Sequence, residues 1–549
     1  MASLPNILFL LSSIFFFFFF ISISALNSAS SFTSLEHTHF SPLRDFCNNR
    51  PYPEACFDSL KLSISLNIDT NLITYLLHTL QTAISEVENL TNLFLNIGGS
   101  NNDIIEKQRG TIQDCQELHQ ITLSSLQRIS VSGIQAGDYR KLSDARTYLS
   151  AALTNKNTCL EGLDSASGPL KPVLVDSLIS TYKHVSNSLS MLPKPVSRKK
   201  GRKNRRLLGF PKWISKKDRR ILQSDDGDEY DPSQVIIVAA DGNGNFSTIS
   251  DAIKFAPVQS DDRIIIFVKR GLYKENVEIP RNKPNIVLIG DGREVTFITG
   301  SRSVGDGWTT YGSATLAVSG EGFLARDITI ENTAGPEKHQ AVALRVNADQ
   351  SALYRCTING YQDTLYVHSF RQFYRECDIS GTIDYIFGNA AVIFQGCHII
   401  SRMPMLGQFT VLTAQSRDSS DEDTGISIQK CSIVATEDLK SAFNNKTVRS
   451  YLGRPWKVYS RTVILDSFID GFIDQAGWIK WTNDDDEDTD SLYYGEYNNK
   501  GPGSATDNRV SWSGYHVMDD YDAYDFTVPN FINGDEWLDS TSFPYDDGV

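Results

Sequence analysis

The sequence predicts two folded parts, an α-helical bundle followed by a β-solenoid of short stacked strands. Apolar residues recur three and four positions apart through residues 40–190, the spacing of one face of a helix. From residue 234 the pattern changes to short runs of Val, Ile and Phe that end in Gly, Asn or Asp. A weak repeat near 20 residues runs through this second part. With 549 residues, the chain exceeds what a single core needs.

An apolar stretch, Ile7–Ile23, opens the chain and is followed by small residues around Ala25. This order predicts a secretory signal peptide over residues 1–25. No Lys or Arg precedes the stretch, and its 17 residues are near the minimum for a membrane span, so an uncleaved anchor is the alternative. Secretion makes the eight cysteines candidates for disulfides. Three sites fit the N-glycosylation pattern: Asn89, Asn245 and Asn445.

The helical part spans residues 40–192. Two runs carry the helical pattern over several turns, NLITYLLHTLQTAISEVENLTNLFLNI and DARTYLSAALTNKNTCLEGL. They predict an independent helical bundle. Four cysteines lie in this part, a close pair (Cys47, Cys56) and a distant pair (Cys115, Cys159), and each pair can cross-link such a bundle.

A basic segment at residues 193–223 separates the two parts. Thirteen Lys and Arg stand in residues 193–222 against a single acidic residue, Asp218. A run of like charge with Pro and Gly cannot bury a core and predicts an exposed linker. The segment is either a solvated tether or a site of proteolytic processing. Two dibasic pairs favour processing: Arg205–Arg206 and Arg219–Arg220.

The second part, which is strongly acidic, carries the repeat. The segments ARDITI, YRCTI, RECDI, QGCHI and QKCSI share a polar ending before Ile, and Cys356, Cys377 and Cys397 follow one another at intervals of 21 and 20 residues. Such a repeat in short strands predicts one solenoid coil per repeat. Coils stack at about 4.8 Å, so residues one repeat apart become lateral neighbours. The acidic balance argues against nucleic-acid binding.

This geometry gathers four polar residues. Asp363 and Asp384 are separated by 21 residues, and Gln340 precedes Gln362 by 22, so all four fall in one cluster across three coils. Neighbours on a strand point to opposite faces, so Gln362 and Asp363 share a site only at a strand end or turn. Two carboxylates one coil apart push their pKa values apart, which suits one acid and one base or nucleophile. The alternative is a structural ladder of Asp along a turn column.

The residues around this cluster resemble the plant pectin methylesterases of the pro-domain type. The similarity spans residues 234–531 in order and spacing, and it implies an all-β, right-handed parallel β-helix. Residues 40–192 resemble the pectin methylesterase inhibitor fold, which implies an all-α four-helix bundle that inhibits the enzyme or assists its folding before processing. The matching motifs are GLYKE (271–275), QAVAL (340–344), GYQDTLY (360–366), GTIDYIFG (381–388) and YLGRPW (451–456).

The resemblance implies hydrolysis of pectin methyl esters to pectate and methanol, without a cofactor. Asp384 matches the nucleophile, and Asp363 matches the general acid that protonates methanol and then activates water. Gln362 matches the oxyanion stabiliser, with Gln340 beside it as a second donor. Arg454 matches the residue that pairs with Asp384, which suits a guanidinium that grips a carboxylate through a fork. The absence of GxSxG is consistent with ester hydrolysis without a serine triad.

The resemblance also implies that Thr315, in SATLAV, and Trp456 contact the substrate. The sequence departs from the family at Tyr385, where Phe is usual, which concerns subsite packing and not the chemistry. Trp478 and Trp481 in GWIKW either line a saccharide groove or pack in the core.

The cysteines of the second part are expected to join coils as Cys356–Cys377 and Cys397–Cys431. A zinc site is not expected, because there is no CxxC and the nine His are scattered. The implied partners are pectin, a processing protease and separate inhibitor proteins. The implied mature form is a monomer secreted to the cell wall, with no nucleic-acid partner.

Two other classes of function compete. A lyase would need a calcium-binding carboxylate cluster and an Arg base. A polygalacturonase would show the strings NTD, GHG and RIK, and none of these three strings occurs. The third hypothesis is an inhibitory protein in which the helical part acts and the β-helix is inert. The intact set of Gln, Asp and Arg residues argues against it. Methanol release from methylated pectin distinguishes the methylesterase from both other hypotheses.

Overall fold

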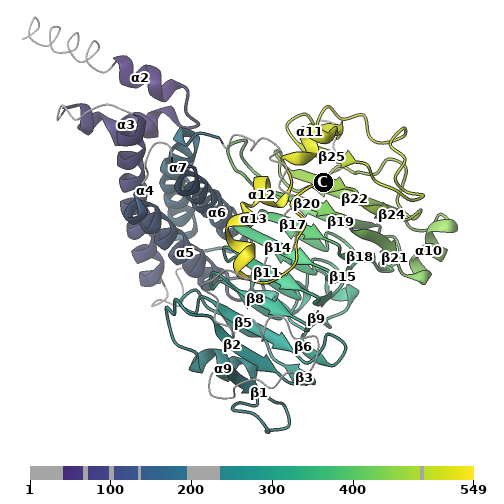
Figure 1. Ribbon diagram of the computed structural model, residues 1–549. Helices are drawn as coiled ribbons and strands as arrows, with labels where there is room; N and C mark the ends of the chain where they lie inside the picture. Colours follow the sequence, from purple (N-terminus) through teal and green to yellow (C-terminus); the bar gives the residue numbers. More distant parts are fainter. Residues whose placement is uncertain (1–40, 66–71, 98–103, 134–137, 195–234, 483–487) are drawn as a thin grey trace, which may run out of the picture.

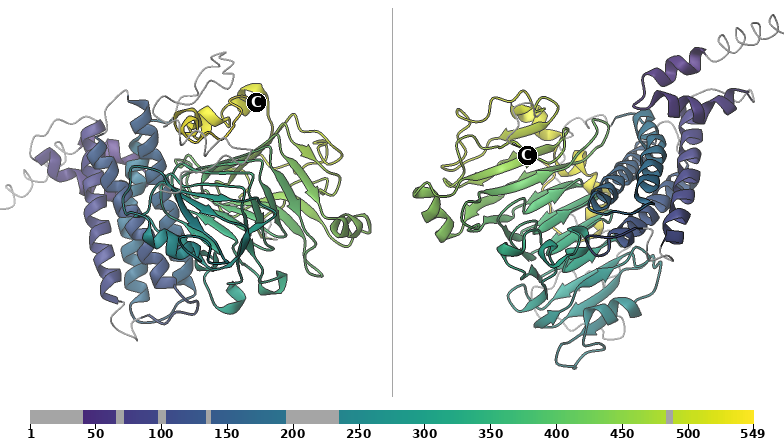
Figure 2. Two further views of the ribbon diagram at one scale, coloured as in Figure 1. Left: turned by 60° about the horizontal axis from the view of Figure 1, so that its bottom comes forward. Right: turned by 180° about the vertical axis from the view of Figure 1, so that it is seen from behind.

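The computed structural model describes residues 41–65, 72–97, 104–133, 138–194, 235–482 and 488–549. Its helical part lies along one flank of a long stack of parallel strands, as Figure 1 and both views of Figure 2 show. The predicted signal peptide over 1–25, the dibasic pairs and nearly all of the linker lie outside the described residues. None of the helices in the described ranges is long and apolar enough to cross a membrane.

Four long helices form the predicted bundle, and two shorter helices precede them. α5 packs on α4 and α6, and α7 closes the bundle against the same two helices. Apolar residues at helical spacing make its core, and Asp138 caps α6 by accepting a hydrogen bond from the Lys141 amide at 3.2 Å. The helices are α2 (Ser41–Asn48), α3 (Pro53–Ser65), α4 (Leu72–Ile97), α5 (Thr111–Ser132), α6 (Tyr139–Asp164) and α7 (Lys171–Met191).

Two disulfides cross-link the bundle. Cys47–Cys56 joins α2 to α3, and Cys115–Cys159 joins α5 to α6. Both pairings were expected from the sequence.

Removing the second disulfide is expected to destabilise the bundle. It closes a loop of 44 residues, and the loss of chain entropy in the unfolded state then contributes about 4 kcal/mol. The double change Cys115→Ala and Cys159→Ala should therefore lower the free energy of unfolding of the bundle in urea. Loss of the short-range pair Cys47–Cys56 should cost less, and an equal cost would contradict the entropic origin.

The second part is a parallel β-helix of three sheets, to which successive strands contribute in turn. The eleven-stranded sheet contains β1 (Val235–Val238), β2 (Ile264–Val268), β5 (Ile286–Gly290), β8 (Leu324–Arg326), β11 (Ser351–Tyr354), β14 (Arg371–Arg375), β17 (Ala391–Gln395), β20 (Gly425–Gln429), β23 (Arg461–Leu465), β25 (Tyr493–Tyr497) and β26 (Tyr515–Val517). The seven-stranded sheet contains β4 (Val277–Ile279), β7 (Leu316–Val318), β10 (Leu344–Val346), β13 (Leu365–Val367), β16 (Ile386–Gly388), β19 (Thr410–Gln415) and β22 (Ser450–Pro455). The eight-stranded sheet contains β3 (Gly271–Lys274), β6 (Thr296–Gly300), β9 (Thr329–Asn332), β12 (Thr357–Asn359), β15 (Asp378–Gly381), β18 (His398–Ser401), β21 (Ser432–Ala435) and β24 (Phe468–Ile469).

The repeat seen in the sequence is an interior column of isoleucines. Each repeat segment ends on an Ile of the eight-stranded sheet, and these side chains pair in register from coil to coil. All are fully buried, so the column fills one side of the core that runs through the β-helix. The residues are Ile330, Ile358, Ile379, Ile399 and Ile433.

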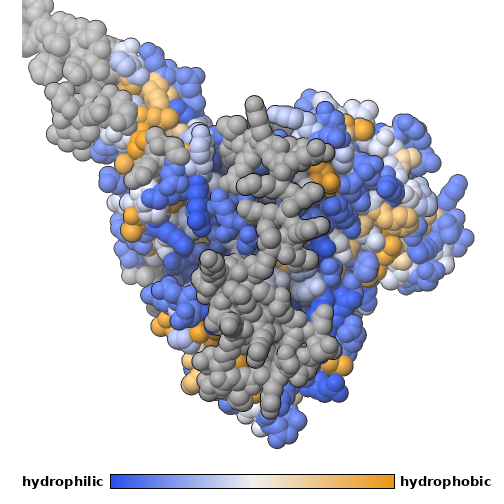
Figure 3. All heavy atoms as spheres, viewed as in Figure 1, coloured by the Kyte–Doolittle hydropathy of each residue, from blue (hydrophilic) through white to orange (hydrophobic). Residues whose placement is uncertain are grey.

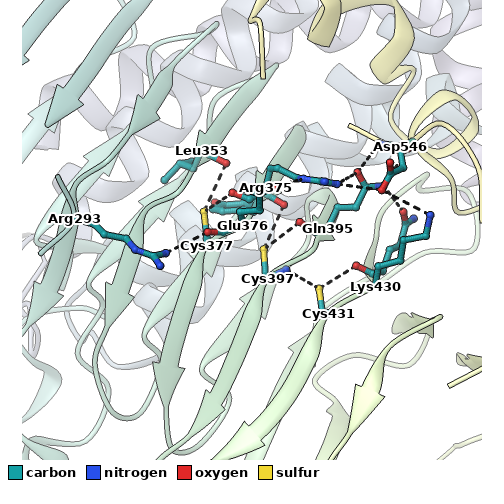
Figure 4. Close-up of polar contacts among 12 residues, drawn as sticks. Arg293, Leu353, Arg375, Glu376, Cys377, Gln395, Cys397, Lys430, Cys431 and Asp546 are labelled. Atoms are coloured by element: carbon teal, nitrogen blue, oxygen red, sulfur yellow. Dashed lines mark hydrogen bonds and ion pairs between the residues drawn. The ribbon is translucent and has the colours of Figure 1, made fainter. Parts of the chain in front are cut away.

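The expected disulfides Cys356–Cys377 and Cys397–Cys431 are wrong in this structure, where all four cysteines are buried free thiols. Each cysteine directly precedes a strand of the eight-stranded sheet, so the four form one column. Figure 4 shows three of them on neighbouring strands. Side chains in such a column point the same way at about the 4.8 Å spacing of strands, whereas a disulfide brings the β-carbons to about 3.8 Å.

The remaining helices close the ends and one flank of the β-helix. After the last strand, the chain packs across the outer face of the eleven-stranded sheet, where Trp537, Leu538 and Phe543 cover Phe373. This packing continues beyond residue 531, where the sequence predicted the domain to end. The helices are α9 (Ile249–Phe255), α10 (Glu437–Asn444), α11 (Asp520–Tyr524), α12 (Val528–Phe531) and α13 (Gly534–Trp537). The described surface in Figure 3 is largely hydrophilic, with small separate hydrophobic patches.

Candidate active site

A cavity of about 260 Å³ lies where helices α5 and α6 face the seven-stranded sheet. The structure brings six residues expected from the sequence to it, together with residues of the helical domain. From the β-helix they are Gln340, Gln362, Asp363, Asp384, Arg454 and Trp456. From the helical domain they are Gln108, Thr111, Asp114, Thr158, Glu161 and Gly162.

Asp384 and Arg454 form a forked ion pair at the floor of this cavity. Arg454 Nε lies 2.9 Å from Asp384 Oδ1, and Nη2 lies 2.6 Å from Oδ2. The guanidinium also lies over the ring of Trp481, 4.2 Å from its centroid. Two parallel charge-assisted hydrogen bonds fix the orientation of the carboxylate and stabilise its ionised form.

A left-handed backbone explains how Gln362 and Asp363 reach the same cavity. Asp363 has φ 61° and Asp384 has φ 49°, each just before a strand of the seven-stranded sheet. This conformation interrupts the alternation of a strand, so adjacent side chains are no longer sent to opposite faces. The register of β13 and β16 places Asp363 beside Asp384, and the Asp363 amide donates to the Ile383 carbonyl at 3.0 Å. The two carboxylates therefore stack as the spacing predicted.

The two carboxylates differ electrostatically. Burial raises the pKa of Asp363 well above its usual range, and the charge of Asp384 raises it further, against a smaller opposing effect of Arg454. Burial also raises the pKa of Asp384, but the hydrogen bonds and charge of Arg454 oppose that rise directly. When one proton is shared between them, it therefore resides on Asp363, and Asp384 stays ionised.

Aromatic rings form one wall of the cavity. Trp456 stacks with Trp481 at 6.1 Å and also faces Phe387, which in turn stacks on Tyr366 at 4.2 Å. Tyr366 and Phe387 were missed from the sequence as site residues, although both lie inside the motifs that carry the catalytic Asp candidates. Trp478 is instead buried and stacks on Tyr494, so of the two tryptophans in GWIKW only Trp481 lines the cavity.

Thr315, which was expected to contact substrate, and Tyr385, where the sequence departs from the family, both lie away from the cavity. Thr315 is fully buried, and its hydroxyl donates to the Glu331 carbonyl at 3.0 Å. Tyr385 points into the core, where its hydroxyl lies 3.0 Å from the hydroxyl of Ser401. The change from the usual Phe thus adds an internal hydrogen bond and leaves the cavity surface unchanged. The three predicted glycosylation residues, Asn89, Asn245 and Asn445, are exposed.

The helical domain is held over the cavity by hydrogen bonds. Thr154 accepts from Asn389 at 2.8 Å, and Thr158 lies 2.9 Å from His368 Nε2. Asp114 accepts from Thr309 at 2.5 Å. Burial raises the pKa of Asp114 to about 7.

Ion pairs between the domains surround these hydrogen bonds. Arg146 of α6 is almost fully buried and contacts both carboxylate oxygens of Asp423. Farther along the interface, Asp144 lies 2.8 Å from Arg371. Both ion pairs come from α6, one of the two helices that line the cavity.

Comparison with known proteins matches each of the two domains to a known family. The sequence profile described as Pectinesterase matches residues 235–535, and the one described as plant invertase/pectin methylesterase inhibitor matches residues 41–191. "Probable pectinesterase/pectinesterase inhibitor 12" of Arabidopsis thaliana is 66% identical over 93% of this chain and 94% of its own length. "Pectinesterase 2" of Citrus sinensis is 42% identical over 94% and 97%.

A solved structure supports the same assignment. The pectin methylesterase from carrot is 50% identical, with a TM-score of 0.57, and the match covers 59% of this chain and all of the carrot chain. The carrot chain thus corresponds in extent to the β-helix alone. The protein belongs to the pectinesterase family, and its N-terminal domain belongs to the plant invertase/pectin methylesterase inhibitor family.

Proposed function

We propose that this pectinesterase removes methyl esters from pectin by covalent catalysis on Asp384. The carboxylate attacks the ester carbonyl carbon, and the developing oxyanion accepts hydrogen bonds from the amide groups of Gln362 and Gln340. Asp363 gives its proton to the departing methoxide, which leaves as methanol. Asp363 then takes a proton from water, which cleaves the acyl-enzyme anhydride and restores Asp384.

The forked ion pair between Arg454 and Asp384, with Asp363 stacked beside it, carries this proposal. A carboxylate is a weak nucleophile, so it must be oriented and kept ionised, and the fork does both. The test is incubation of the protein, cleaved in its linker, with methylated pectin. We expect methanol without unsaturated chain ends. Unsaturated ends would indicate a lyase, and neither product would favour an inhibitory protein.

The activity of the cleaved protein is expected to be bell-shaped in pH. Asp384 must be ionised, so kcat/KM should fall as the pH drops through its pKa. Asp363 must be protonated to release methanol, so kcat/KM should also fall as the pH rises through its raised pKa. Initial rates of methanol release across pH measure both limbs. A rate that climbs with pH until the protein unfolds would contradict the role of Asp363 as the acid.

We infer that the helical domain inhibits the enzyme until the linker is cut. Supporting this, Thr158 and Glu161 of α6 line the cavity that holds Asp363 and Asp384, so a pectin chain and α6 compete for the same space. Cleavage at Arg205–Arg206 or Arg219–Arg220 would release the domain. An assisting role in folding is compatible with the same contacts.

We also propose that the protein is secreted to the cell wall. Pectin, the substrate of this family, is a cell-wall polymer, and the apolar N-terminus is suited to export. N-terminal sequencing of the β-helix fragment identifies the dibasic site that is used, and sequencing of the uncleaved chain or of the released helical domain identifies the signal cleavage.

A further inference from the structure

Carboxylates of the helical domain meet cations of the β-helix along the cleft. Glu161 lies 2.8 Å from Lys457, and Glu117 lies 3.7 Å from Arg345. The β-helix part of the chain is strongly acidic, so cations gathered beside its cleft stand out against the rest of its surface. The substrate of this enzyme becomes a polyanion as its esters are removed. The helical domain likewise presents carboxylates, those of Glu161 and Glu117, to the cations of the β-helix.

Lys457 differs from the arginines at this interface in its partners. Arg345 lies over the ring of Tyr311, 3.4 Å from its centroid, and donates to Asn347 at 2.9 Å. Arg371 grips Asp349 within the β-helix. Among the described residues, Lys457 forms one ion pair, and its partner is Glu161. Removal of the helical domain thus frees the ammonium group of Lys457 for another carboxylate.

The position of Lys457 places that group beside the catalytic cavity. Lys457 directly follows Trp456, and its Nζ lies 6.0 Å from the centroid of that ring. Trp456 and Glu161 both line the cavity that contains Asp384. Glu161 thus holds a carboxylate inside the cleft, at the edge of the aromatic wall against which a sugar ring would stack.

We propose that Lys457 binds the free carboxylate of a galacturonate residue next to the ester under attack, and that Glu161 occupies this place before processing. The inference rests on the proposed function. A methyl ester is neutral and attracts an ammonium group weakly, whereas an ionised carboxylate forms a charge-assisted hydrogen bond with it. The enzyme would then favour esters that neighbour residues already de-esterified, and its products would be contiguous runs of free galacturonate.

The first test compares Lys457→Met with the wild type, each cleaved in the linker. Methanol release is measured on a highly methylated pectin and on a pectin de-esterified at random to about half. We expect kcat/KM of the variant to fall about tenfold on the second substrate, mainly through KM, and less than twofold on the first, because one hydrogen bond to a charged group is lost. Lys457→Arg should restore the preference. Lys274→Met, an exposed lysine of the eight-stranded sheet, is the matched control and should change neither rate.

A second readout uses unmethylated oligogalacturonate as an inhibitor. We expect its inhibition constant to rise about tenfold in Lys457→Met and to stay unchanged in Lys274→Met. In the uncleaved chain, Glu161→Gln should raise activity, whereas Asp176→Asn, at an exposed residue of α7, should not.

The outcomes separate this inference from the proposed function. An equal loss on both pectins, with unchanged inhibition by oligogalacturonate, would mean that Lys457 only supports Trp456 and would overturn the inference. No methanol from either pectin with the cleaved wild type would instead overturn the proposed function. A selective loss on the half-methylated pectin supports both.

Discussion

Asp384→Asn is expected to reduce methanol release from pectin by about 10⁴-fold or more, the scale seen when a nucleophile is removed from a covalent hydrolase. The amide keeps the shape of the carboxylate but is neutral and cannot attack the ester. The residual rate would come from binding and from the oxyanion donors, which remain in place. Initial-rate methanol assays on the protein cleaved in its linker measure the effect.

The same change also removes the partner of Arg454, so loss of stability must be separated from loss of chemistry. Leaving one member of a largely buried ion pair unpaired costs about 3 kcal/mol or more. Thermal unfolding of the variant, monitored by circular dichroism, shows whether it is folded at the assay temperature. Asp378→Asn is the matched control, because Asp378 lies on the eight-stranded sheet and pairs with Arg293 and His398 outside the cavity. If Asp384→Asn were folded and retained even a tenth of the activity, Asp384 would not be the nucleophile.

The sequence was sufficient to predict the cluster because a solenoid converts spacing into distance. An interval of 21 residues stacks Asp363 on Asp384, and the same interval appears in the paired strands β13 and β16. The interior Ile column made the repeat visible, since one buried position recurs in every coil. The solenoid and the cluster of Gln340, Gln362, Asp363 and Asp384 therefore followed from one periodicity, whereas Arg454 and Trp456 were expected only from the resemblance to the family.

The sequence could not show in which direction individual side chains point. Regular spacing put Cys356 next to Cys377, but it gave no information on whether the two thiols approach each other or stand parallel. The left-handed backbone at Asp363 and Asp384 is set by the corner of the coil, and it decides which side chains enter the cavity. Thr315 shows the same limit, because the fold turns its hydroxyl toward the Glu331 carbonyl.

The contacts between the two domains could not be predicted from sequence patterns either. Arg146 lies within α6, and the acidic residue nearest to it in the chain, Asp144, pairs with Arg371 instead. The partner of Arg146, Asp423, is 277 residues away. Pairing across that distance depends on how the two domains dock, which no periodicity encodes.

Weakening this pair is expected to activate the uncleaved chain. The Arg146 side chain is 2% exposed and Asp423 is 33% exposed, so removal of either partner leaves the other charge unpaired and at least partly buried at the interface. Such a loss costs about 3 kcal/mol and would raise the undocked fraction about 100-fold. Arg146→Met should therefore raise the methanol-release rate of the uncleaved chain by about two orders of magnitude, up to the rate of the cleaved protein.

Two further variants decide whether the domain interface is responsible. Arg146 also donates to the Leu192 carbonyl within the bundle, so Asp423→Asn removes the same ion pair from the other side without touching the bundle. Arg140→Met, on the same helix, removes an exposed pair with Glu536, and exposed pairs contribute about 1 kcal/mol or less, so activation should be at most about fivefold. All variants should match the wild type once the linker is cut. If the uncleaved wild type already turned over as fast as the cleaved protein, the docked helices would not block the cleft, and the shared cavity would be open to pectin from another side.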